Sequence, residues 1–257
     1  AASEAAGWQD GEESEEEGGR PWYLDAHDLE LAPSDPGAHR FTLLVLHSCS
    51  GGPDDFTAFF HRLELPFRRR VRVVVPCAPL RVENHYGWEK ELNSWFEYEG
   101  NDVKHAAQLE EQRARVLLLV EQECQLLPGC DPRRLVILGL SQGAALAVDV
   151  ALRARARVGG VVALRGMALP SRHLAALPQH DQGPGLLRLL AFNGARDWLC
   201  PPEEARASYE ALRPYGVDVA FDTDEWLAHG CARGRQKLSR PEMQKVSAFL
   251  KECWSDL

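Results

Sequence analysis

The chain has 257 residues, of which 45% are hydrophobic and 26% charged, an ordinary globular composition with enough length for one large domain and a substantial core. Its formal net charge of −9 is uneven, because residues 1–19 hold seven carboxylates and no lysine or arginine. The remainder is close to neutral and has no dominant basic face, so nothing points to a nucleic-acid partner.

In chain order, an acidic tail precedes segments in which strands and helices alternate. Residues 1–19 are rich in Glu and Gly and are expected to be disordered, whereas residues 20–257 are expected to form a single domain. The expected strands are short apolar runs at residues 40–46, 70–76, 134–139, 158–164, 187–192 and 217–222. The expected helices are at residues 103–127, with Asp102 as N-cap, and at 144–155, 203–213 and 240–254. This alternation predicts an α/β protein with a mostly parallel central sheet flanked by helices, whose functional residues gather at the carboxyl ends of the strands.

The segment Gly139-Leu-Ser141-Gln-Gly143 is a G-x-S-x-G motif, which alone is weak evidence of function. Its position strengthens the signal, because an apolar strand ends here and a helix built on small residues starts at Ala144. A nucleophilic serine stands on a sharp strand-to-helix turn, and only neighbours with little side chain fit around its strained backbone. Ser141 is therefore the predicted nucleophile, and the alternative is a tight turn with an incidental serine.

The acid and the base of a catalytic triad would follow Ser141 in that order along the chain. Asp197 lies just past the strand expected at residues 187–192, and His229 lies on a polar loop after the last expected strand. Histidine is suited to take a serine proton near neutral pH. We therefore predict Asp197 as the orienting acid and His229 as the base.

Other residues compete for these two roles. The rival histidines and acids are His173, His180, Asp222, Asp224 and Glu225. Both histidines are expected to be surface loop residues, and the three acids lie on the same loop as the predicted base. Asp197 as a loop-capping residue and His229 as a solvated histidine are the structural alternatives.

Two backbone N–H groups are predicted to form an oxyanion hole. One belongs to Gln142, the residue after the nucleophile, and the other to Cys49 in the Gly-rich loop after the first strand. The thiol of Cys49 would then lie near Ser141, which makes it a minor rival nucleophile.

The connection from Pro79 to Gly100 is dense in aromatic residues. Trp88, Trp95 and Phe96 are candidates for a lid or for the wall of an acyl pocket. Packing of these rings on the core is the equal alternative, although the polar residues between them favour partial exposure.

The seven cysteines, at positions 49, 77, 124, 130, 200, 231 and 253, form an odd set without a C-x-x-C pair. This spacing predicts reduced thiols in a cytosol-like compartment and no metal site. No apolar run is long enough to span a bilayer and no signal-peptide pattern opens the chain, so the expected location is cytoplasmic. Because the first residue is Ala1, the earlier removal of a targeting segment stays open.

From about residue 41 to residue 250 the chain resembles the acyl-protein thioesterases and lysophospholipase-like carboxylesterases. The most specific matches are Gly139-Leu-Ser-Gln-Gly-Ala-Ala-Leu146, Pro76-Cys-Ala-Pro79 and Ser94-Trp-Phe96. The resemblance also places Asp197 and His229 at the family's acid and base, and Cys49 at its early oxyanion donor. The chain departs from the family at His47-Ser48, where His-Gly is usual, and over residues 83–92.

The resemblance implies a single α/β-hydrolase domain without a cofactor. It further implies hydrolysis of acyl esters or thioesters, with S-acylated proteins and lysolipids among the candidate substrates and transient contact with a membrane surface. Two other functions stay open: a non-catalytic homologue that binds a ligand in the same pocket, and an acyltransferase with the same triad.

Overall fold

The computed structural model of the chain describes residues 21, 23–56, 60, 63–85, 88–174, 177, 185–230 and 238–257. The predicted acidic tail lies outside these residues. The strands are β1 (Leu29–Leu31), β2 (Phe41–Leu46), β3 (Val71–Val75), β4 (Leu80–His85), β5 (Trp88–Asn93), β6 (Tyr98–Glu99), β7 (Asp102–Val103), β8 (Leu135–Leu140), β9 (Gly160–Leu164), β10 (Leu187–Gly194) and β11 (Val217–Asp224). The helices are α2 (Ala106–Leu126), α3 (Gln142–Arg153), α4 (Ser171–Leu174), α5 (Pro202–Glu210) and α6 (Arg240–Trp254).

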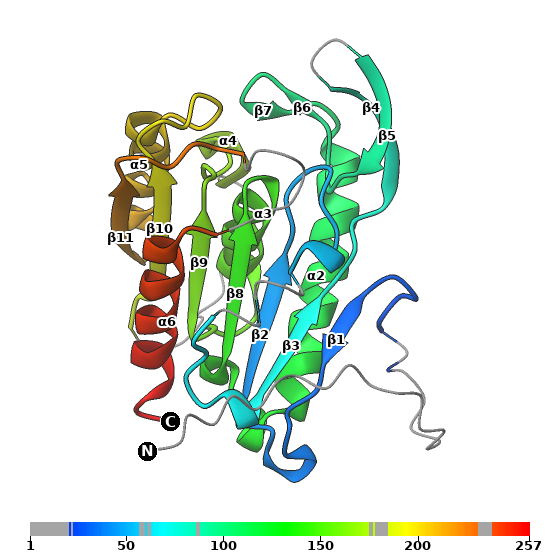
Figure 1. Cartoon of the computed structure of the whole chain (residues 1–257). Helices are drawn as coiled ribbons and strands as arrows, with labels where there is room; N and C mark the ends of the chain where they lie inside the picture. The colour runs from blue at the N-terminus through cyan, green and yellow to red at the C-terminus, as the bar shows by residue number, and fades with distance from the viewer. Residues whose placement is uncertain are drawn as a thin grey trace.

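Seven strands form the central sheet in the order β1-β3-β2-β8-β9-β10-β11. β1 pairs antiparallel with β3, and every other neighbouring pair is parallel. The predicted mostly parallel sheet flanked by helices is therefore confirmed. The parallel strands end at the top of Figure 1, where the hairpin β4–β5, the short pair β6–β7 and α4 also lie.

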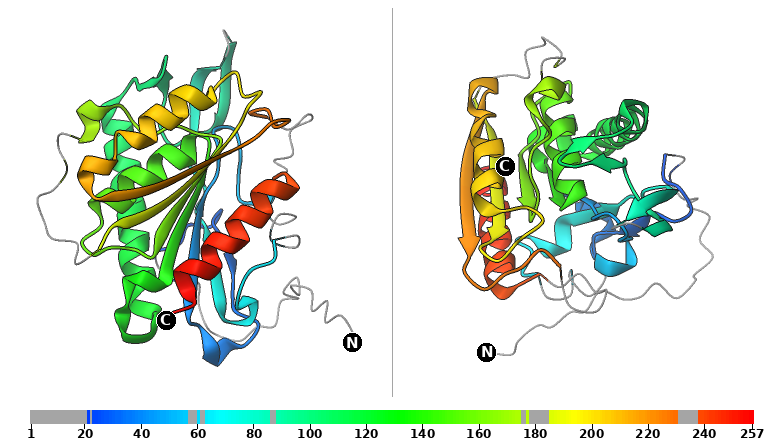
Figure 2. Two further views of the ribbon diagram at one scale, coloured as in Figure 1. Left: turned by 90° about the vertical axis from the view of Figure 1, so that its left-hand side faces the viewer. Right: turned by 90° about the horizontal axis from the view of Figure 1, so that it is seen from above.

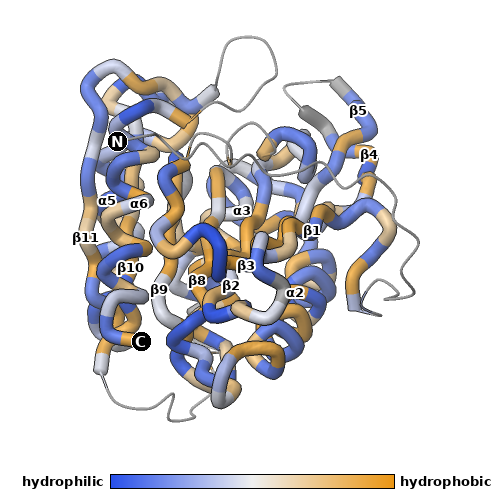
Figure 3. Tube along the Cα trace, turned by 60° about the horizontal axis from the view of Figure 1, so that its bottom comes forward, coloured by the Kyte–Doolittle hydropathy of each residue, from blue (hydrophilic) through white to orange (hydrophobic). Residues whose placement is uncertain are grey.

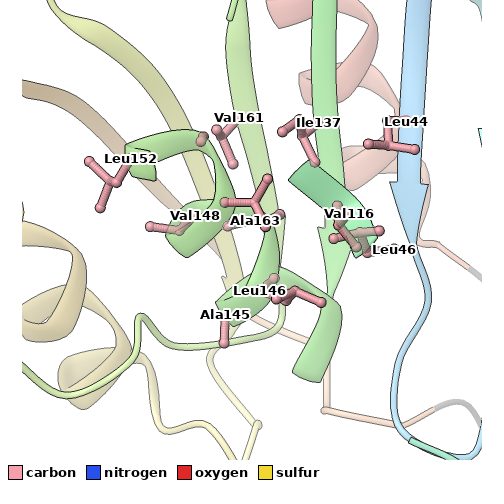
Figure 4. Close-up of a cluster of buried hydrophobic side chains, with 14 of the residues drawn as sticks. Leu44, Leu46, Val116, Ile137, Ala145, Leu146, Val148, Leu152, Val161 and Ala163 are labelled. Atoms are coloured by element: carbon pink, nitrogen blue, oxygen red, sulfur yellow. The ribbon is translucent and has the colours of Figure 1, made fainter. Parts of the chain in front are cut away.

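Helices cover both faces of this sheet, with α2 and α3 on one side and α6 on the other (Figure 2). Because side chains of a strand alternate between faces, each central strand contributes residues to two hydrophobic clusters, one on each face of the sheet. Leu44 and Ile137 join the cluster under α2 and α3, shown in Figure 4, whereas Val45 and Leu138 join the cluster under α6. The hydrophobic colouring of β2, β3 and β8 in Figure 3 follows from this burial on both sides.

Two features of the region before α2 differ from the sequence prediction. The helix starts at Ala106 with His105 as N-cap, and Asp102 belongs instead to β7. The carboxylate of Asp102 lies 3.0 Å from His173 Nε2, so a tertiary contact competes with the capping role. The second feature is the antiparallel hairpin β4–β5, which the sequence did not predict.

Among the described residues, no helix combines the length and apolar character needed to cross a membrane.

Candidate functional site

Ser141 stands alone between β8, which ends at Leu140, and α3, which begins at Gln142. Its φ of 55° is in a region that residues with a side chain rarely adopt. The close packing around it explains the glycines: a Cβ on Gly139 would lie 2.1 Å from the carbonyl oxygen of Gly143, and one on Gly166 would lie 2.7 Å from that of Ser141. The local sequence therefore forces the serine into a half-buried turn at the carboxyl end of the central strand.

Gly143→Ala is expected to destabilise the fold by about 3 kcal/mol, because overpacking of this kind strains backbone that cannot move aside. Its added Cβ would lie 2.2 Å from the carbonyl oxygen of Leu46 and 2.6 Å from that of His47. Urea unfolding followed by circular dichroism measures the loss. Gly37→Ala is the matched control, since its Cβ would have no neighbour within 4 Å. Equal stability of the two variants would contradict the close approach of β2 to α3.

A continuous hydrogen-bonded chain joins Ser141, His229 and Asp197. The Oγ of Ser141 lies 2.9 Å from Nε2 of His229, and Nδ1 of His229 lies 2.9 Å from Oδ2 of Asp197. The other carboxylate oxygen accepts the N–H groups of Leu199 at 3.0 Å and Cys200 at 2.8 Å. Because a carboxylate accepts, the proton of the imidazole belongs on Nδ1, and Nε2 is left to accept from the serine hydroxyl.

The structure places the rival residues elsewhere. His173 was expected on a surface loop but lies in α4, where its side chain is largely buried against Asp102, whereas His180 lies outside the described residues. Asp222 pairs with Lys245 at 2.5 Å, and the carboxylate of Asp224 accepts from the N–H of Trp226. In the described part of the chain, none of the three rival acids forms a hydrogen bond with His229.

The two residues predicted to donate to an oxyanion, Cys49 and Gln142, are placed by different elements. Gln142 is the first residue of α3, and Cys49 follows the end of β2 that packs against Gly143. Within the described residues, neither N–H group has a hydrogen-bond acceptor. In contrast to its backbone N–H, the thiol of Cys49 has no expected role, because burial raises its pKa to about 11. It is therefore protonated near neutral pH and a poor nucleophile.

Side-chain hydrogen bonds that the sequence did not predict fix the loop after β2 and the segment of Trp95 and Phe96. The amide oxygen of Gln142 accepts the N–H of Trp95 at 2.9 Å, and its nitrogen donates to the carbonyl of Phe96. His47 accepts the N–H of Ala78 at Nε2 and donates from Nδ1 to the carbonyl of Ser48, both within 2.9 Å. Burial lowers the pKa of His47 to about 4, so the ring is neutral and keeps both bonds.

The aromatic candidates for a pocket wall are placed differently from one another. Of the two equal alternatives, a pocket wall or packing on the core, Trp95 and Phe96 follow the second with 0% exposure, although the polar residues between the rings had favoured partial exposure. The Trp95 indole donates to the carbonyl of His47 at 2.8 Å and its ring packs on that imidazole, so Trp95 supports the loop after β2 from the core. Tyr98 in β6 packs edge-to-face on Phe96 and is 39% exposed. The side chain of Trp88 lies outside the described residues.

The thiol of Cys200 lies next to the Asp197–His229 pair. Donor atoms of Asp197, Cys200 and His229 lie within 4.8 Å of one another, a spacing that a metal ion would accept. However, burial, with the nearby Asp197 carboxylate, raises the pKa of the Cys200 thiol to about 12, and a thiol must lose its proton to bind a metal. The arrangement therefore fits a hydrogen-bonded pair better than a metal centre. The six described cysteines are all free.

The sequence and the fold of this chain are similar to those of known proteins. A family model described as Phospholipase/Carboxylesterase matches residues 34–254. Acyl-protein thioesterase 1 of Gibberella zeae is 26% identical over 190 residues, which are 71% of this chain and 77% of the relative. Among solved structures, Zea mays acyl-protein thioesterase 2 has a TM-score of 0.70 at 22% identity, covering 88% of this chain and 98% of its own. Arabidopsis thaliana SOBER1 has a TM-score of 0.71 at 21% identity, covering 83% and 99%.

Proposed function

Since this chain belongs to the phospholipase/carboxylesterase family and has its α/β-hydrolase fold, we propose that it hydrolyses acyl esters or thioesters through Ser141, His229 and Asp197. Family membership confirms the resemblance inferred from the motifs. The hydrogen-bonded chain from the Ser141 hydroxyl through the imidazole to the Asp197 carboxylate carries the proposal for the three residues.

In the proposed reaction, His229 Nε2 takes the hydroxyl proton as Ser141 Oγ attacks the carbonyl carbon. The negative charge that forms on the carbonyl oxygen is stabilised by the N–H groups of Cys49 and Gln142, each donor contributing about 3 kcal/mol. The imidazolium then protonates the leaving alcohol or thiol, and an acyl-serine remains. Water, deprotonated by the same imidazole, releases the acid and restores the serine. Asp197 holds the imidazole with its proton on Nδ1 throughout.

A fluorophosphonate probe tests the nucleophile directly. The expected result is one covalent adduct, located on the peptide that contains Ser141 by mass spectrometry of the digested wild-type protein. A series of p-nitrophenyl esters beside an S-acylated peptide then measures the choice between ester and thioester. Acid rather than a transferred acyl product separates a hydrolase from an acyltransferase. An unlabelled, folded protein that hydrolyses none of these substrates would favour the ligand-binding alternative.

Cys49→Ala is expected to keep kcat for p-nitrophenyl butyrate within about threefold of the wild type. In the proposed mechanism Cys49 acts through its backbone N–H, which alanine retains, and its own thiol is protonated near neutral pH because burial raises the pKa to about 11. Steady-state kinetics at pH 7 to 8 check this. Loss of nearly all activity would instead identify the thiol as the nucleophile.

A further inference from the structure

A buried arginine stands immediately after β9. Arg165 is only 2% exposed, and its φ of 48° is uncommon for a residue with a long side chain. Burial of a guanidinium and a left-handed backbone are each unfavourable, so the surrounding contacts must fix both. The proposed mechanism does not use this residue.

The Arg165 side chain links the start of α6 to the loop that carries His229. Its Nε donates to Oε1 of Glu242 at 2.7 Å, and a second guanidinium nitrogen donates to Oε2. Its Nη1 donates to the backbone carbonyl of His229 at 3.3 Å. Glu242 is itself completely buried and forms a capping box with Ser239 at the N-terminus of α6. The guanidinium therefore reaches the His229 backbone from a fixed point on a helix.

The backbone on either side of Arg165 reaches the nucleophile. The carbonyl of Leu164 accepts the N–H of Ser141 at 2.8 Å, and Gly166 packs so closely that a Cβ there would lie 2.7 Å from the carbonyl oxygen of Ser141. A segment of three residues thus contacts both ends of the Ser141–His229 hydrogen bond. The backbone of the segment contacts the serine backbone, and the Arg165 side chain contacts the carbonyl of His229.

We propose that Arg165 is a positioning residue that holds the imidazole of His229 at hydrogen-bonding distance from Ser141. This inference rests on the proposed function, because it assigns Arg165 a role through the base. The competing role is structural: the Arg165–Glu242 ion pair would fasten α6 to the sheet without affecting the reaction. The two roles differ in whether loss of the pair changes the reactivity of Ser141 in a protein that stays folded.

The test variant is the double substitution Arg165→Met with Glu242→Gln. Removal of both charges avoids an unpaired buried ion, and glutamine retains the capping box, so the variant is designed to stay folded. We expect kcat for p-nitrophenyl butyrate and the second-order rate of fluorophosphonate labelling each to fall about 100-fold, the size of effect that a misplacement of about 1 Å produces. KM is expected to stay within about threefold. Arg165→Lys should lose about tenfold in the same rates, because one ammonium cannot bind both Glu242 and the His229 carbonyl.

A second buried ion pair, near the amino ends of the parallel strands, is the matched control. Arg72 donates from Nε to both carboxylate oxygens of Glu123, at 3.1 Å and 3.0 Å, and the two residues are 7% and 0% exposed. Arg72→Met with Glu123→Gln is expected to lower the melting temperature while the labelling rate stays at the wild-type value.

The outcomes separate the inference from the proposed function. Wild-type labelling rates in the folded double variant, or in Arg165→Lys if the double variant does not fold, would overturn the positioning role. An equal loss of rate in the Arg72 control would overturn it as well. A wild-type protein that is neither labelled nor active would overturn the proposed function instead.

Discussion

Replacing Ser141 with alanine is expected to lower kcat for a p-nitrophenyl ester by a factor on the order of a million, because the three residues act as a unit and no other group can form the acyl intermediate. The hydroxyl is the only group removed, and the proposed oxyanion donors remain in place. Stopped assays with a sensitive fluorogenic ester give the range needed to measure such a loss. Ser255→Ala, at the far end of α6, is the control and should have wild-type kinetics.

A companion substitution at the same position tests the backbone of the elbow. Ser141→Gly is expected to be more stable than Ser141→Ala by about 1 kcal/mol, because glycine adopts the φ of 55° without a side-chain clash. Chemical unfolding of the two inactive proteins measures this difference. Residual hydrolysis of more than about a thousandth of the wild-type rate in either variant would contradict Ser141 as the nucleophile.

Asp197→Asn is expected to lower kcat by about 10,000-fold, because the substitution reverses the tautomer of His229. The N–H groups of Leu199 and Cys200 at one side of the carboxylate require an acceptor, so the amide oxygen of asparagine must face them. Its amide nitrogen then faces His229 Nδ1 and donates to it. The imidazole proton moves to Nε2, and this nitrogen can then no longer accept the proton of Ser141.

The control for this prediction is the rival acid Asp222, which was expected on the loop of His229 but lies within β11. Asp222→Asn should keep kcat within about twofold, since Asp222 pairs with Lys245 at 2.5 Å on the surface. Measurement of kcat for both variants over pH 6 to 9 distinguishes them. The assignment of Asp197 is wrong if the effects of the two substitutions are exchanged.

The parts of the fold that sequence predicted well have a local cause. β8 is an apolar run and the first turn of α3 contains small residues, so the turn at Ser141 can be predicted from the residues next to it. Similarly, α6 was predicted with its observed bounds, Arg240–Trp254, and the serine and glutamate of its capping box are three residues apart. The chain order expected of a catalytic triad led to Asp197 and His229, and in the structure these two residues form a hydrogen bond.

The parts that sequence did not predict depend on contacts between distant residues. The alternation of Leu80 and Val82 with polar residues is too short to reveal the hairpin β4–β5, and both apolar side chains are exposed, at 64% and 66%, rather than packed on a core. The pair of Arg165 and Glu242 spans 77 positions, and neither residue has a local motif that points to the other. The neutral state of His47 likewise depends on the fold, because burial lowers its pKa and its donor partner, the N–H of Ala78, is 31 positions away.

The hairpin β4–β5 projects from the molecule above the ends of the parallel strands (Figure 1). Its two ends meet at the base, where the N–H of Ser94 donates to the carbonyl of Pro79 at 3.0 Å, so the chain enters and leaves it at one point. A segment attached in this way can lengthen, shorten or be exchanged between homologues while the sheet beneath it folds unchanged. The hairpin and the sheet that carries Ser141 can therefore change, in evolution or by engineering, independently of each other.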